Sequence, residues 1–154
     1  VFGFTKFLRD LLKRENPDLV GVAFDPPGGS FRRDIFPEYK ANRPPTPEDI
    51  KLSVPYVKRL LEAMCIPILE VQGFEADDVI GTLAKRGAEA GFNVYMVTPD
   101  KDYGQLVDDK CVIYNIGIKT RYAALLKKLL GGGFSRSASA AQTNDQHNIP
   151  LFSL

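Results

Sequence analysis

The chain has 154 residues, the size of one ordinary domain, so a second full domain is not expected. Hydrophobic residues make up 44% and charged residues 25%, a composition that excludes a mainly disordered chain and a fibrous repeat. The sequence shows neither a membrane-length apolar run nor a signal pattern, so we expect a cytoplasmic protein without a membrane partner. A single histidine and two distant cysteines make a zinc site and a disulfide framework poor candidates.

The net charge is +1, but the basic and acidic residues lie in separate parts of the sequence. Basic side chains gather between residues 31 and 59, whereas acidic side chains gather between residues 70 and 109. A basic region followed by an acidic one is the first indication of function, because it separates a cation-bearing surface from an acidic one.

The first half of the chain alternates helical and strand patterns. Apolar spacing predicts a helix over 4–13 that ends near Asn16, and then a buried strand over 19–24. A proline-rich, basic stretch over 30–47 follows, too long and too charged for a simple connection. Thr46 is the expected N-cap of the next helix, with Pro47 as its first residue, and Pro55 is expected to kink this helix before it ends near Met64.

The second half continues the alternation. The patterns predict a strand over 66–71, a helix over 75–90, a strand over 92–98, a helical turn over 103–107 and a strand over 111–115. Strands that alternate with helices are typical of an α/β fold with a mostly parallel central sheet flanked by helices. We take 1–118 as this domain, and we expect 119–154 to be a short helix followed by a disordered tail foreign to the domain.

Acidic residues stand where predicted strands end or helices begin. Because active sites of open α/β sheets form at the carboxyl ends of the strands, these acids are expected to meet at one edge. Gathered carboxylates repel one another unless a cation neutralises them, and oxygen ligands favour Mg²⁺ or Mn²⁺. The candidate metal ligands are Asp25, Glu75, Asp77, Asp78, Asp100 and Asp102.

Each acidic group also has a plainer interpretation. Glu75, Asp77 and Asp78 can simply favour the start of a helix through its dipole, and Asp25 and Asp100 can be turn residues. Their conjunction at one predicted edge, beside a basic stretch, favours the metal site.

The basic stretch interleaves cations with aromatic rings. Such a pattern can hold phosphates and stack bases, although a solvated loop anchored by its rings is the alternative. The candidate DNA-binding residues are Phe31, Arg32, Arg33, Tyr39, Lys40 and Arg43. Beside an acidic metal site, this stretch indicates a phosphodiester substrate.

Five segments together resemble the 5′ to 3′ exonuclease domains of bacterial DNA polymerase I, in the flap endonuclease family. In order they are 22–25 (VAFD), 30–34 (SFRRD), 39–49 (YKANRPPTPED), 73–79 (GFEADDV) and 98–102 (TPDKD). The resemblance runs from about residue 2 to residue 115. It implies a PIN-like fold with a basic arch insertion, in the cytoplasm of a bacterium.

The resemblance also implies a function. It predicts a metal-dependent phosphodiesterase that removes 5′ ends and flaps from DNA, and RNA primers, in replication and repair, with a linked polymerase domain as a further expectation. By this analogy the six acids bind two metal ions, and Asp25, Arg32 and Lys40 take catalytic roles. Attack by a metal-activated water is expected, without a covalent intermediate.

Parts of the family pattern are not found here. The family's first strand, with its own aspartate, is expected upstream of Val1, and its later acidic motif and helix-hairpin-helix have no match after Ile118. A catalytically impaired DNA-binding fragment is therefore the alternative function. A second alternative takes Asp100 as the nucleophile of an aspartyl-phosphate phosphatase, a weak signal because Gly104 departs from that pattern.

Overall fold

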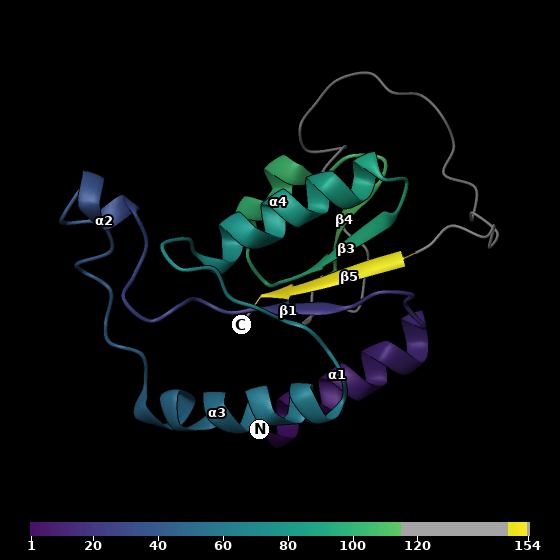
Figure 1. Ribbon diagram of the computed structural model, residues 1–154, viewed down its shortest axis with the longest axis horizontal. Coiled ribbons are helices and arrows are strands. Elements are labelled where there is room, and N and C mark those ends of the chain that lie inside the picture. The colour runs from purple at the N-terminus through teal and green to yellow at the C-terminus, as the bar shows by residue number, and fades with distance from the viewer. Residues whose placement is uncertain (115–147, 154) are drawn as a thin grey trace.

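A five-stranded parallel sheet organises the molecule in a computed structural model (Figure 1). The structure describes residues 1–114 and the backbone of 148–153. The strands lie in the order β2-β1-β5-β3-β4. They are β1 (Gly21–Ala23), β2 (Ile68–Leu69), β3 (Asn93–Val97), β4 (Cys111–Tyr114) and β5 (Asn148–Ser153).

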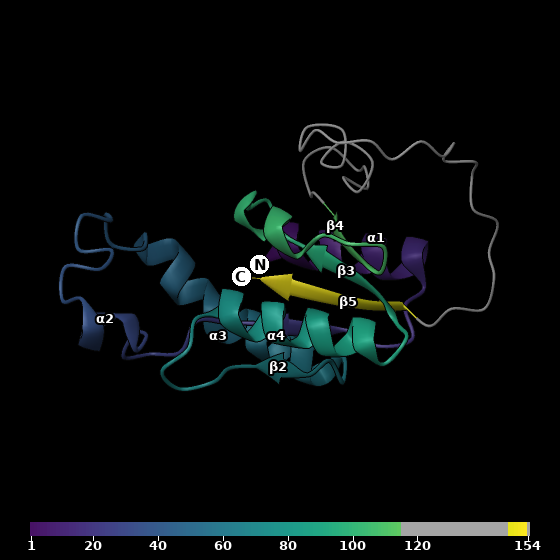
Figure 2. The same cartoon turned by 90° about the horizontal axis from the view of Figure 1, so that it is seen from above.

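Helices cover both faces of the sheet. α1 (Phe2–Glu15) and α3 (Glu48–Ala63) lie on one face, and α4 (Ala76–Glu89) lies on the other, as Figures 1 and 2 show. The remaining elements are the short helix α2 (Arg32–Ile35) and the 3₁₀ helix η1 (Asp102–Leu106). The predicted α/β class with a mostly parallel sheet is confirmed.

The period-two alternation of the strands divides the core into two layers. Val22 and Val97 pack into the cluster on the α1 and α3 face, with Leu8 and Leu61. Their neighbours Ala23 and Met96 belong to the cluster on the other face, with Ile80 and Ala84 of α4. Both faces of the sheet are therefore covered, which explains why the strand sequences are apolar without interruption.

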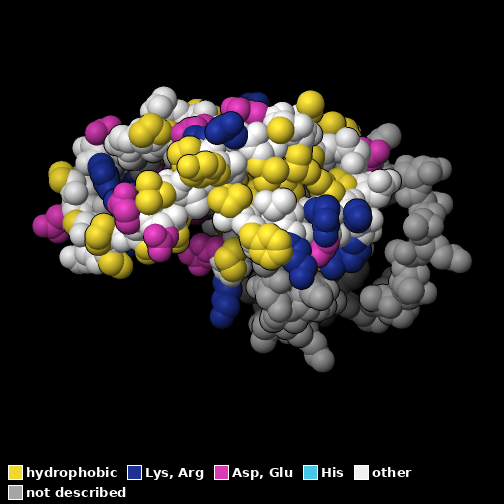
Figure 3. Space-filling model, turned by 90° about the horizontal axis from the view of Figure 1, so that it is seen from below, with side chains coloured by type: hydrophobic (Ala, Val, Ile, Leu, Met, Phe, Trp, Pro, Cys, Tyr) yellow, Lys and Arg dark blue, Asp and Glu magenta, His cyan; other side chains and the backbone are white. Residues whose placement is uncertain are grey.

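The side that carries α1 and α3 keeps part of its apolar surface exposed. Figure 3 shows hydrophobic side chains gathered on this side of the molecule. The exposed large hydrophobic residues of these two helices are Phe2, Ile50, Leu52 and Tyr56. No helix within the described residues is both long enough and apolar enough to cross a membrane.

Two expectations need correction. Helix α3 begins at Glu48 with Pro47 as its N-cap, one residue later than expected, and no side chain caps it, so Thr46 is not the N-cap. The second correction concerns the tail, because Asn148–Ser153 is a strand rather than disordered. This strand lies between β1 and β3 and pairs with both. It forms there because the backbone N–H and C=O groups along the facing edges of β1 and β3 need hydrogen-bond partners. The short helix expected near 122–130 lies outside the described residues.

Candidate nuclease site at the carboxyl edge of the sheet

The carboxyl ends of the strands face the part of the chain that carries the basic stretch. Figures 1 and 2 show the segment with α2 standing beyond this edge, on the side to which the arrow of β5 points. This segment runs from the end of β1 to the start of α3 and corresponds to the predicted basic arch. The fold thus brings the basic stretch and the acidic edge together.

The N-terminus of α4 is where the acids meet. Asp25, two residues after the end of β1, accepts a hydrogen bond from the backbone N–H of Ala76 at 2.8 Å. Glu75 and Asp78 form a capping box, in which each side chain accepts from the other's backbone N–H. This explains locally why the helix begins here, since acceptors satisfy its free N–H groups and negative charge favours its positive end.

Cations from the arch hold two of these acids. Lys40 places its Nζ 2.7 Å from Oε2 of Glu75, and Arg32 makes two hydrogen bonds of 2.7 Å to the two carboxylate oxygens of Asp78. Ser30 and Tyr39 each donate a further hydrogen bond of 3.3 Å to Glu75. The backbone of Lys40 is in the left-handed region, with a φ of 58°, which is strained for a residue with a side chain. The strained residue is the one that forms the ion pair with Glu75.

The electrostatics of these pairs favour the charged forms. The hydrogen bonds from Arg32 lower the pKa of Asp78, and those to Asp78 raise the pKa of Arg32. Burial opposes the charge of Glu75 and of Lys40, but their mutual attraction outweighs it, so the pKa of Glu75 is lowered and that of Lys40 is raised. At neutral pH both acids are ionised, and each is balanced by an arch cation.

Asp77 has a different kind of partner. The hydroxyl of Tyr103, in η1, donates a hydrogen bond of 2.6 Å to Oδ1 of Asp77. The sequence pattern indicated only a helical turn at this tyrosine, so its contact with the site was missed. Its position directly after the Asp-Lys-Asp segment is the signal that could have found it.

The loop after β3 carries Asp100 and Asp102, which are both exposed. Thr98 accepts a hydrogen bond from the backbone N–H of Asp100, and Asp100 accepts one from the N–H of Asp102, a turn that shapes the loop locally. Among the described residues, no group of three or more acids is arranged to hold a metal ion. The acids share one edge, but Asp25, Glu75, Asp77, Asp78 and Asp100 each accept from a different set of donors.

The donor set nevertheless suits a hard cation. All six candidates offer carboxylate oxygens, and the two acids at the start of α4 already attract an ammonium and a guanidinium group. The six carboxylates therefore stay the predicted ligands of a divalent cation. In the structure, Lys40 and Arg32 are the partners of two of them, Glu75 and Asp78.

Phe31 of the arch packs against Phe74, which lies just before α4, and against Arg32. The rings of Phe31 and Phe74 lie 5.5 Å apart at 54°, and the guanidinium of Arg32 sits 4.9 Å from the Phe31 ring. Arg33 and Arg43 are exposed, without an ion pair in the described part of the chain. These two cations are the ones left available to a phosphate.

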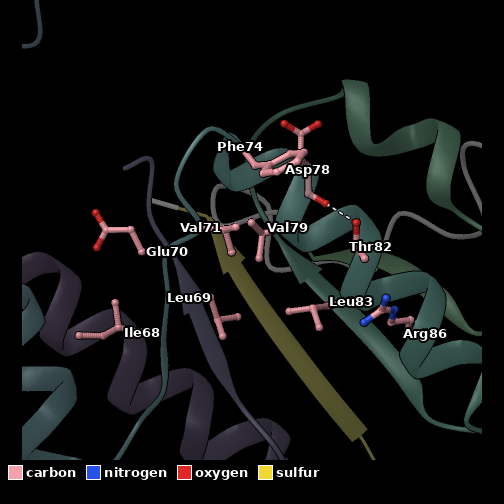
Figure 4. Close-up of a pocket in the computed structure, with 10 residues that line it drawn as sticks. All are labelled: Ile68, Leu69, Glu70, Val71, Phe74, Asp78, Val79, Thr82, Leu83 and Arg86. Carbon is pink, nitrogen blue, oxygen red and sulfur yellow. Dashed lines mark hydrogen bonds between the residues drawn. The ribbon is translucent and has the colours of Figure 1, made fainter. Parts of the chain in front are cut away.

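A hollow of about 490 Å³ lies beside this edge, between β2 and α4. Figure 4 shows that its lining is largely apolar, with Leu69, Val79 and Leu83 facing one another across it. Asp78 reaches it from α4, while the other candidate acids do not line it. Of the candidate acids, the hollow therefore shares Asp78 alone with the acidic edge.

Comparison with known proteins places these features in context. The family model described as the N-terminal resolvase-like domain of 5′-3′ exonuclease matches residues 1–129. DNA polymerase I of Caldicellulosiruptor bescii is 40% identical over 119 residues, which are 77% of this chain and 14% of that protein. The 5′-3′ exonuclease of Aquifex aeolicus is 40% identical over 115 residues, 75% of this chain and 40% of that protein. The chain thus spans less than half the length of these relatives.

Solved structures show the same fold. A crystal structure of the bacteriophage T5 flap endonuclease, in a pseudo-enzyme-product complex with DNA and metal ions, superimposes with a TM-score of 0.60 at 23% identity. The match covers 78% of this chain and 48% of that one. A second structure of the T5 protein, crystallised with metal ions, gives a TM-score of 0.62 at 24% identity with the same coverage.

Proposed function

Because the chain belongs to the family of 5′-3′ exonuclease N-terminal resolvase-like domains, we propose that it is a divalent-metal-dependent nuclease domain acting on the 5′ ends and flaps of DNA. The observation that carries the proposal is the meeting of Asp25, which follows β1, with the start of α4, where Glu75 and Asp78 pair with Lys40 and Arg32 of the arch. Phosphodiester cleavage needs both, since oxygen ligands hold the cation and basic side chains hold the phosphate.

Each group has a role in this proposal. Asp25, Glu75, Asp77, Asp78, Asp100 and Asp102 hold the cation, and the exposed Arg33 and Arg43 draw the DNA backbone to the arch. Lys40 and Arg32, on leaving Glu75 and Asp78, turn to the scissile phosphate. The chemistry that the cation supplies is activation of a water and neutralisation of the leaving oxygen. Mg²⁺ or Mn²⁺ fits the oxygen-only donor set.

The wider setting follows the family. We propose that the domain acts in the cytoplasm of a bacterium, removes flaps and RNA primers during replication and repair, and is linked to a polymerase domain. The names of the relatives support this proposal, since DNA polymerase I proteins of Caldicellulosiruptor bescii and Thermus thermophilus match over 77% and 73% of this chain.

A second candidate function is DNA binding without turnover. The specific observation in its favour is that Lys40 and Arg32 neutralise Glu75 and Asp78, while no three-acid group is poised for a metal within the described residues. Such a fragment would hold DNA through its arch cations alone, and its binding would weaken steeply with salt.

One experiment separates the two. End-labelled 5′-flap DNA is incubated with the chain in Mg²⁺ and in a chelator, alongside Asp77→Ala with Asp78→Ala. The matched control replaces Glu62 and Glu89, exposed acids on α3 and α4 outside the site. Cleavage lost with the chelator and the site variant, but kept in the control, supports the nuclease. Salt-sensitive binding without cleavage supports the binding fragment.

A further inference from the structure

Tyr103 occupies a position between the core and the acidic edge. Its side chain is only 4% exposed and packs in the cluster formed by α4, β3 and β4, with Ile80, Met96 and Ile113. Its hydroxyl reaches out of this cluster to Oδ1 of Asp77 at 2.6 Å. Close packing in the core leaves the Tyr103 ring little rotational freedom, so the position of its hydroxyl is fixed.

A second contact also docks η1 on α4. Leu106, three residues after Tyr103, lies so close to Gly81 that a Cβ there would meet its Cδ1 at 3.3 Å. Asp77 and Gly81 are four residues apart and share one face of the helix, as Tyr103 and Leu106 share one face of the 3₁₀ turn. The docking therefore has an apolar half at Leu106 and a polar half at Tyr103.

This geometry bears on both acidic groups. Tyr103 directly follows Asp102, so the Tyr103–Asp77 bond ties the loop of Asp100 and Asp102 to the start of α4. The hydrogen bonds within the loop shape it but do not position it against the helix. Within the described residues Asp77 forms no ion pair, unlike Glu75 and Asp78, so its second oxygen remains for a cation.

We propose that Tyr103 is a positioning residue, which orients the Asp77 carboxylate and fixes the Asp100–Asp102 loop against α4 for divalent-cation binding. The inference rests on the proposed function, because it assigns Asp77 to the metal. Partners that orient a ligand in this way typically change metal affinity by about 10-fold to 100-fold when they are removed.

The test is Tyr103→Phe, which keeps the ring in the core and removes only the hydroxyl. Binding of Mn²⁺ to the full chain is measured by electron paramagnetic resonance, without DNA. The dissociation constant is expected to rise at least about 10-fold. Tyr56→Phe, which alters an exposed hydroxyl on α3, is the matched control and is expected to bind as the wild type does.

Two further variants separate positioning from general support of the fold. In an Asp77→Ala background, Tyr103→Phe is expected to cause no additional loss of Mn²⁺ affinity, because the Tyr103 hydroxyl has no acceptor there and the hydrogen bond is already absent. Leu106→Ala loosens the apolar half of the docking without touching the hydroxyl, and it is expected to weaken Mn²⁺ binding less than Tyr103→Phe does. Equal losses from Leu106→Ala and Tyr103→Phe would overturn the role of the hydroxyl.

The outcomes distinguish this inference from the proposed function. If the wild type binds Mn²⁺ and Tyr103→Phe binds it equally well, the positioning role is wrong while the metal site stands. If the wild type shows no Mn²⁺ binding up to millimolar concentration, both the metal-dependent function and the role of Tyr103 are wrong.

Discussion

The Arg32–Asp78 pair joins the arch to α4 through two hydrogen bonds of 2.7 Å. We predict that Arg32→Met lowers the free energy of unfolding by roughly 1 kcal/mol at pH 7, the upper range for partly exposed ion pairs. The pKa of Asp78 in the folded state lies below its ordinary 3.8. The stabilisation is therefore complete above the unfolded pKa and is lost as the pH falls through the lowered one.

Urea unfolding of the wild type and of Arg32→Met at pH 7 and at pH 3 measures this effect. The difference between the two proteins is expected to shrink below about pH 4. Arg33→Met, at an exposed neighbour, is the matched control and is expected to change stability little at either pH. An equal difference at pH 7 and pH 3 would show that the guanidinium contributes through packing rather than charge.

The two cysteines differ in their exposure to solvent. Cys111 is 2% exposed and donates to the carbonyl of Ala84, and burial with the nearby Asp108 raises the pKa of its thiol to about 11. Cys65 is exposed. Since the thiolate is the reactive form, iodoacetamide at pH 8 is expected to label Cys65 and spare Cys111 until urea unfolds the chain. Mass spectrometry of the peptides checks this, and native labelling of Cys111 would contradict its burial.

Among the helices, α3 contains a proline, Pro55, that does not belong to the buried face of the helix. Pro55 is exposed inside the helix, whereas Val57 and Leu61 make the buried stripe. We predict that Pro55→Ala raises the free energy of unfolding by about 1 to 3 kcal/mol, because it restores a backbone donor and removes a clash. Pro47→Ala is the control, since at the N-cap no intrahelical hydrogen bond is missing. Thermal unfolding of both variants measures this effect, and a loss of stability in Pro55→Ala would mean that the fold needs the proline at this position.

Local patterns in the sequence predicted most of the helices and strands, but they did not predict which residues far apart in the sequence contact one another. The helices α1, α3 and α4, the turn η1 and the four strands up to Tyr114 follow from apolar periodicity, with ends that differ by at most two residues. The short helix α2 lies in the basic stretch and was not predicted. The acidic edge followed from the rule for parallel sheets. The pairing of Lys40 with Glu75 did not, because the two lie 35 residues apart and only the tertiary fold brings them together. Tyr103 was missed for the same reason.

At the scale of the whole molecule, β5 joins two halves of the sheet. β1 pairs with β2 on one side and β3 with β4 on the other, and β5 is the strand through which β1 and β3 are connected. The sequence before it is rich in Ser, Ala, Gln and Asn, and the segment contains Pro150, so no strand was expected there. β5 forms because β1 and β3 need hydrogen-bond partners for their backbone groups. This need arises only when the sheet assembles, so it cannot be read from the local sequence of 148–153.

Pro150 makes β5 an imperfect central strand, and this leads to a prediction. It lies opposite Tyr95 in the pairing with β3 and has no backbone N–H to donate. Pro150→Val is expected to raise the free energy of unfolding by about 1 kcal/mol, because it supplies a ladder donor and a β-branched side chain. Pro99→Ala, in the loop after β3, is the control for loss of a proline outside the sheet.

Removal of 148–154 is expected to destabilise the chain and promote association, since β1 and β3 then present open edges. If neither Pro150→Val nor this truncation changes urea unfolding or the sedimentation profile, β5 is not the strand that closes the sheet in solution.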